Sequence, residues 1–61
     1  MPLIEVTVYD TRIDDDTVPK LIEKLTDALC ECTSEAIRPD TWVLVHGMPA
    51  KQWGRGGKPA G

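Results

Sequence analysis

The sequence predicts a single α/β domain over residues 1–61, in which one helix joins two parallel strands and a C-terminal hairpin or arm follows. Residues 3–9 alternate between apolar and polar side chains, as expected of a strand with one buried face. Residues 18–32 repeat apolar side chains at steps of three and four, which is typical of an amphipathic helix. Residues 42–46 are rich in valine and leucine and predict a second strand.

The first strand is expected over Leu3–Tyr9, directly after Pro2. Ile4, Val6 and Val8 alternate along it with more polar residues, so these three side chains should share the buried face.

Three consecutive aspartates, Asp14–Asp16, precede the helix and are interpreted as its N-terminal cap. An aspartate side chain accepts backbone N–H bonds at a helix start, and its negative charge suits that end of the helix dipole. Pro19 then falls in the first turn, where a missing N–H is tolerated. The run lacks the alternating spacing of a calcium loop, so no metal site is predicted.

The helix is expected to bury one stripe of side chains and to expose the charged side opposite. The stripe consists of Val18, Leu21, Ile22, Leu25, Ala28, Leu29 and Cys32. Cys32 is therefore expected in the core, whereas Cys30 lies off the stripe. Because side chains two apart on a helix point in different directions, these cysteines are not expected to form a disulfide.

A strand–helix–strand order with a crossover of this length favours parallel pairing and a right-handed connection. In the second strand, Val43 and Val45 are expected to face the helix, which leaves Trp42, Leu44 and His46 on the other face. An uncovered face and two open strand edges predict an oligomer, in which sheets join or stack between subunits.

The segment after the second strand is rich in glycine, and its W-G-R-G-G run predicts a tight hairpin or an adaptable arm. All ten acidic residues lie at or before Asp40, whereas Lys51, Arg55 and Lys58 follow it. The basic tail is either simply solvated or forms a rim that attracts anions.

Size and composition limit the classes of function. The chain has 61 residues, and a domain this short buries only about 60% of the surface of its unfolded chain, so association of subunits is the expected stabiliser. His46 is the only histidine, which argues against zinc, and no cofactor is expected. A net charge of −3 argues against nucleic acid as a partner. Without an apolar span or a signal-peptide pattern, no membrane partner is expected, and the location is expected to be cytoplasmic.

The unusual chemical feature of the sequence is Met1-Pro2 leading straight into a strand. If Met1 is removed, Pro2 becomes a secondary amine held at the start of a rigid strand. An α-amino group titrates at about 7.7–8.0, and desolvation or a neighbouring cation lowers that value. A base near neutrality is suited to abstract a carbon-bound proton beside a carbonyl. The alternative is that Pro2 only begins the protein.

The opening P-L-I-E-V-T-V-Y-D-T-R, the amphipathic helix, the valine-rich strand and the W-G-x-G-G segment together resemble the 4-oxalocrotonate tautomerase family over nearly the whole chain. The most specific parts are Pro2, Arg12 ten residues later, and the aromatic-plus-glycine segment near the end. The resemblance implies a β-α-β subunit assembled as a hexamer, a trimer of dimers, and an isomerase of aromatic-compound catabolism that moves a proton on a small carboxylic acid.

Site residues follow from this resemblance position by position. Pro2 corresponds to the general base and acid, Arg12 to the arginine that binds the substrate carboxylate, and Trp53 to the aromatic wall of the pocket. The resemblance implies that these groups converge from different subunits. The alternatives are that Arg12 is a surface arginine beside acidic residues and that Trp53 only packs in an interface.

One position departs from the family pattern. Trp42 stands where the archetype has a second arginine, which binds carboxylate and polarises the carbonyl. Arg38 lies nearby but is separated from the strand by Pro39, and Arg55 in the tail is a candidate replacement cation. The indole of Trp42 would then be either a flat pocket wall or a subunit contact. A smaller or more aromatic acid than the archetypal diacid is expected as substrate.

Two other functions stay open at this stage. A non-catalytic oligomeric binding protein on the same scaffold would explain the missing arginine. A lyase or hydratase would use Pro2 as a protonated amine or as a covalent iminium. No acid follows Asp40 to activate water in the way that hydratases and dehalogenases of the family require.

Overall fold

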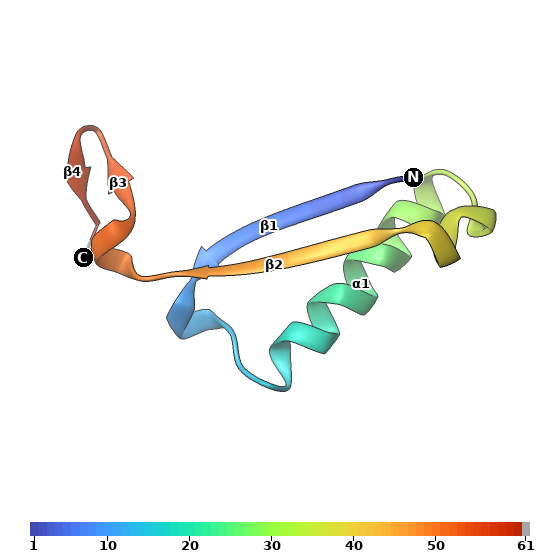
Figure 1. Ribbon diagram of the computed structural model, residues 1–61, viewed down its shortest axis with the longest axis horizontal. Helices are drawn as coiled ribbons and strands as arrows, with labels where there is room; N and C mark the ends of the chain where they lie inside the picture. Colours follow the sequence, from blue (N-terminus) through green and yellow to red (C-terminus); the bar gives the residue numbers. More distant parts are fainter. Residues whose placement is uncertain (61) are drawn as a thin grey trace.

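A computed structural model describes residues 1–60, and its ribbon is drawn in Figure 1. The molecule is elongated, with extents of 42 × 26 × 15 Å. In chain order the elements are β1 (Leu3–Tyr9), the short 3₁₀ helix η1 (Asp10–Arg12), α1 (Thr17–Cys32), η2 (Glu35–Asp40), β2 (Trp42–Met48), η3 (Ala50–Gln52), β3 (Gly54–Arg55) and β4 (Lys58–Pro59).

The strands β1 and β2 pair in parallel, as the sequence predicts. The register places Leu3 opposite Trp42 and Tyr9 opposite Met48. The bounds of β1 agree with the prediction, while β2 continues two residues beyond His46. Each strand has one unpaired edge, because β1 and β2 are the whole of their sheet within the described residues. The predicted β-α-β order with a C-terminal hairpin is therefore confirmed.

The start of α1 is stabilised by Asp14, as expected of the acidic run. One carboxylate oxygen of Asp14 accepts hydrogen bonds from the backbone N–H groups of Asp16, at 2.9 Å, and Thr17, at 2.7 Å. The bond from Thr17 is the main reason why the pKa of Asp14 lies below its ordinary value of 3.8. A carboxylate with a depressed pKa stabilises the fold at neutral pH and loses that contribution as the pH falls through the depressed value.

The two faces of the β1–β2 sheet differ in burial, because α1 packs on only one of them. Ile4, Val6 and Val8 of β1, with Val43 and Val45 of β2, are half-buried on the face toward α1. The other face is uncovered.

On the uncovered face, which we call the open face, Leu3 is 54% exposed and Trp42 is 55% exposed. A hydrogen bond of 3.1 Å joins the Glu5 carboxylate and His46 Nε2 near its middle. The predicted division of the second strand between its two faces is thus confirmed.

The predicted burial of the two cysteines is wrong. Cys30 is buried, with 3% of its surface exposed, whereas Cys32 is exposed. The helical pattern alone does not account for this: η2 contacts α1, and Arg38 of η2 lies close to Asp27 and Cys30. Arg38 donates a hydrogen bond of 2.8 Å to Asp27, which holds η2 against α1.

The C-terminal hairpin is the tighter of the two alternatives that the sequence allowed. Strands β3 and β4 are antiparallel, and Gly56 and Gly57 between them have φ angles of 60° and 83°. Such angles are readily adopted by glycine alone, which explains the glycine pair. The hairpin stands at the end of the molecule farthest from the N-terminus (Figure 1).

The surface of one chain is large for its mass. Its accessible area is 4730 Å², whereas a folded monomer of this mass is expected to expose about 3,900 Å². Among residues 1–60, Cys30 is the only hydrophobic residue that is buried; every other one is half-buried or exposed. No helix within the same residues has the length and apolar character needed to cross a membrane.

Candidate active site

Pro2 lies immediately before β1, at the end of the sheet where η2 leads into β2. Its carbonyl oxygen accepts a hydrogen bond of 3.0 Å from the backbone N–H of Trp42. Met1 precedes it and is 92% exposed. While Met1 is attached, the nitrogen of Pro2 is an amide; after its removal the same nitrogen is a secondary amine, free to take a proton.

The indole of Trp42 is beside Pro2 in the sheet but on the open face, next to Leu3. More than half of the surface of Trp42 is left uncovered by its own chain. Trp42 therefore offers a flat apolar surface at the Pro2 end of the molecule, to a ligand or to another subunit.

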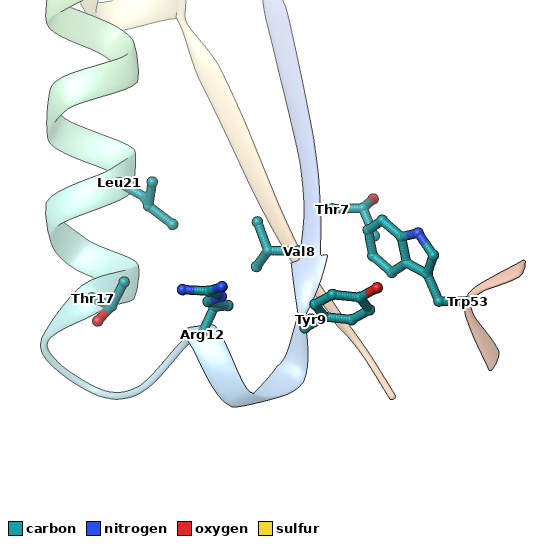
Figure 2. Close-up of a pocket in the computed structure, with 7 residues that line it drawn as sticks. All are labelled: Thr7, Val8, Tyr9, Arg12, Thr17, Leu21 and Trp53. Carbon is teal, nitrogen blue, oxygen red and sulfur yellow. The ribbon is translucent and has the colours of Figure 1, made fainter. Parts of the chain in front are cut away.

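A concave pocket lies at the opposite end of β1. Its volume is about 370 Å³, and it is lined by Thr7, Val8, Tyr9, Arg12, Thr17, Leu21 and Trp53. Figure 2 shows these side chains around the end of β1 and the first turns of α1. Leu21 and Val8 are apolar, and Arg12 brings the only charged group of the lining. Such a pocket suits a small anion with an apolar body.

Arg12 ends η1 and is exposed. Within residues 1–60 no ion pair involves it, although it lies on the surface beside Asp10 of the same short helix. Its side chain extends toward α1, near Thr17 (Figure 2). An unpaired guanidinium beside an apolar wall can bind a carboxylate through two parallel hydrogen bonds.

The chain around η1 packs closely against a glycine of β2. A Cβ atom added to Gly47 would lie 2.5 Å from Cδ1 of Ile13, which follows Arg12 directly. The missing side chain lets Ile13 pack against β2 and thereby helps to fix η1.

Trp53 follows η3 and is half-buried. Its backbone N–H bonds to the carbonyl of Ala50 at 3.0 Å. Its ring lies against Tyr9, with a centroid distance of 4.6 Å and an angle of 50° between the rings. The contact gives Trp53 a fixed place at the pocket.

Arg38 and Arg55 differ in their freedom to act on a ligand. Arg38 donates hydrogen bonds of 3.1 Å to each carboxylate oxygen of Glu35 as well as its bond to Asp27. These bonds raise the pKa of Arg38 and lower that of Glu35. Arg55 is exposed in β3 and forms no ion pair within the described part of the chain. Arg38 is thus occupied, whereas Arg55 is not.

One chain does not bring the expected site residues together. Pro2 and Trp42 lie at the beginning of the β1–β2 pair, while Arg12, Trp53 and Arg55 lie beyond its other end (Figure 1). A parallel strand of seven residues spans about 23 Å. A ligand of small-molecule size cannot reach both ends of the same chain.

Sequence reasoning did not single out several residues of the pocket. Tyr9, Thr7 and Val8 belong to β1 and were treated only as strand residues, while Thr17 and Leu21 were treated as helix residues. The order of the elements could have identified these residues. Because the connection between β1 and α1 is short, the last residues of the strand and the first residues of the helix must lie close together.

Among residues 1–60 no group of three or more histidine, cysteine, aspartate or glutamate side chains is placed to hold a metal ion.

The chain can be compared with protein families, with curated proteins and with solved structures. A family model described as "Tautomerase enzyme" matches residues 2–61. No curated protein and no solved structure matches the chain.

Proposed function

This chain belongs to the tautomerase enzyme family, and on that premise we propose that it catalyses enol–keto proton transfer on a small 2-hydroxy-enoic or 2-keto acid. The observation that carries the proposal is the match over residues 2–61, which begins at Pro2 and includes the whole pocket lining. The free thiols of Cys30 and Cys32 are consistent with a reducing compartment, and the cytoplasm is the proposed location.

Pro2, freed of Met1, is the proposed base and acid. Its secondary amine accepts a proton from one atom of the substrate and returns a proton to another, so substrate and product are isomers and no co-reactant is consumed. The ring fixes the direction of the nitrogen lone pair. Burial of the amine among apolar groups lowers its pKa toward neutrality, because desolvation disfavours the charged form.

Arg12 is the proposed carboxylate ligand, and Trp53 the apolar wall beside it. The guanidinium has no competing acid within residues 1–60, and the indole is held by Tyr9. Together they orient the acid and keep water from the reacting atoms. Arg55, in the hairpin that follows Trp53, is proposed as a second cation at the pocket rim.

The reaction requires more than one copy of the chain, because Pro2 and Arg12 lie at opposite ends of β1. The free edge of β1 offers a simple solution. If two β1 edges pair antiparallel about a twofold axis, Pro2 of one copy meets the Tyr9–Arg12 end of the other. Two equivalent sites result in each dimer. We propose that the open faces then bring such dimers together into a homohexamer, a trimer of dimers.

Trp42 narrows the substrate class. An indole cannot replace the bidentate contacts of a guanidinium to a second carboxylate. Arg38, the nearest arginine in sequence, is engaged by Asp27 and Glu35. The proposed substrate is accordingly an acid with one carboxylate and a flat or aromatic remainder.

A second candidate function is supported by the same tryptophan. Without the second arginine, the assembly would bind an aromatic acid and not convert it. The two functions differ in what Pro2 does: binding alone requires no free amine, whereas turnover does.

The decisive experiment measures ketonisation of phenylenolpyruvate and 2-hydroxymuconate by protein whose intact mass shows that Met1 is absent. We expect turnover of phenylenolpyruvate, and a loss of about 100-fold or more in kcat for Pro2→Ala. Protein that retains Met1 serves as the matched control and should be equally impaired. Turnover that survives both changes would rule out Pro2 as the base, and binding without turnover by Met1-free protein would establish the second function.

A further inference from the structure

The pocket contains a phenol group to which the proposed reaction has assigned no part. Tyr9 is the last residue of β1, and its ring is half-buried against Trp53. None of the side-chain hydrogen bonds within residues 1–60 involves the Tyr9 hydroxyl. The two rings lie beside each other, with the hydroxyl oxygen of Tyr9 directed away from the β1 backbone (Figure 2). The Tyr9 ring is therefore held in place, while its hydroxyl group is free to donate a hydrogen bond to a ligand.

Proton transfer next to a carbonyl creates a need for such a donor. Negative charge develops on the substrate oxygen when the carbon-bound proton leaves, and a hydrogen-bond donor placed there lowers the barrier. Trp42 cannot donate two parallel hydrogen bonds, and Arg38 is held by Asp27 and Glu35. Arg12 is the only charged group of the pocket lining and is already assigned to the carboxylate.

Among the uncharged donors of the lining, Tyr9 is the best placed. Thr17 lies beside Asp14, whose pKa it helps to lower, and its hydroxyl oxygen is directed away from Arg12 (Figure 2). The hydroxyl of Thr7 is free but sits on a short side chain, close to the strand. The phenol of Tyr9 extends farther from β1, and its ring is in tilted contact with that of Trp53.

We propose that the Tyr9 hydroxyl donates a hydrogen bond to the substrate oxygen on which enolate charge develops, while Arg12 binds the neighbouring carboxylate. The proton of the phenol stays on Tyr9, and the transferred proton is still carried by Pro2. This inference rests on the proposed function and adds to it a donor that takes the place of the missing guanidinium. It also specifies the substrate: an acid whose oxygen is on the carbon next to the carboxylate.

The binding test compares two acids that differ in that oxygen. Phenylpyruvate carries it and 3-phenylpropionate does not, and quenching of tryptophan fluorescence gives the affinity of each. In Tyr9→Phe, which keeps the ring against Trp53, we expect phenylpyruvate to bind roughly tenfold more weakly and 3-phenylpropionate to bind as before. Equal changes for both acids, no change for either, or no binding of either acid to the unaltered protein would overturn the inference.

The kinetic test uses phenylenolpyruvate and Met1-free protein. Tyr9→Phe is expected to lower kcat about 100-fold and to raise KM by no more than about tenfold, because the donor contributes more to the charge that develops in the transition state than to ground-state binding. Thr7→Val is the comparison: if it causes this loss and Tyr9→Phe does not, the donor is Thr7.

The two tests distinguish failure of the proposed proton transfer from failure of the proposed role of Tyr9. If the unaltered protein lacks turnover, the proposed proton transfer fails, yet the pair of acids still decides whether Tyr9 contacts the oxygen. If turnover is present and Tyr9→Phe has full kcat, the proton transfer stands and the role of Tyr9 fails.

Discussion

Trp42 combines a constrained backbone with a free side chain. Its N–H bonds to the carbonyl of Pro2, and its indole is 55% exposed on the open face. The backbone of Trp42 is held by this hydrogen bond at the start of the β1–β2 pair. Residue 42 can therefore vary without a change in the pairing of β1 and β2.

Replacing Trp42 by arginine should shift the preference toward diacids. We expect Trp42→Arg to raise kcat/KM for 2-hydroxymuconate about tenfold or more, since a guanidinium adds charge-assisted, two-pronged contacts to a carboxylate. The ratio of kcat/KM for 2-hydroxymuconate and phenylenolpyruvate is the measurement. Trp42→Phe is the control, which keeps a flat apolar ring and should not change that ratio in the same direction. A folded Trp42→Arg protein with an unchanged ratio would show that residue 42 does not contact the substrate.

At the level of single residues, the expected site could be named from sequence but not located. Arg12 and Trp53 meet at one pocket because η1 and η3 both follow the same ends of the paired strands. Pro2 is at the far end, which follows from strand direction alone. Tyr9 was missed because a tyrosine in an alternating strand has no feature that distinguishes a pocket residue from any other.

The elements themselves were largely predictable, because their signals are local. Alternation gave β1, a spacing of three and four gave α1, and paired glycines gave the β3–β4 turn. The burial of Cys30 was not predictable in this way. It depends on η2, whose return over α1 is held by Arg38 from outside the helix.

The contact between η2 and α1 predicts how the two thiols react. In the unaltered protein a thiol reagent such as Ellman's reagent should modify Cys32 quickly and Cys30 slowly, since Cys32 is exposed and Cys30 is not. Arg38→Ala removes the bonds to Asp27 and Glu35 and is expected to speed the slow phase about tenfold while the fast phase keeps its rate.

Cys32→Ser, alone and with Arg38→Ala, isolates the slow phase and serves as the control. If Cys30 reacts at the same rate with and without Arg38, then the apolar packing of η2 protects the thiol and the arginine does not.

The whole chain exposes roughly 800 Å² more than a monomer of its mass should, which is about one side of a standard protein–protein interface. The excess is consistent with the uncovered open face and the free edge of β1. It supports the proposal that copies of the chain complete one another, both in stability and in the site.

Mixed assemblies test this proposal directly. Pro2→Ala and Arg12→Ala proteins should each be inactive alone, since each lacks one part of every site. If the two are unfolded together in equal amounts and refolded, about a quarter of the sites should combine an intact Pro2 with an intact Arg12 from a neighbouring copy.

Recovered ketonisation of phenylenolpyruvate is the measurement, and each variant refolded by itself is the control. Complete inactivity of a mixture that co-assembles would mean that both residues of a site belong to one chain.

The hydrogen bond between Trp42 and Pro2 at the start of the sheet bears on the removal of Met1. The Trp42 N–H bonds to the carbonyl of Pro2, and the nitrogen of Pro2, which has no hydrogen while Met1 is attached, contributes nothing to the ladder. Trimming the exposed methionine therefore breaks no hydrogen bond of the sheet. Under the proposed function, folding and activation would then be separable: a chain that keeps Met1 can form the same sheet while inert, and removal of Met1 exposes the nitrogen proposed as the base.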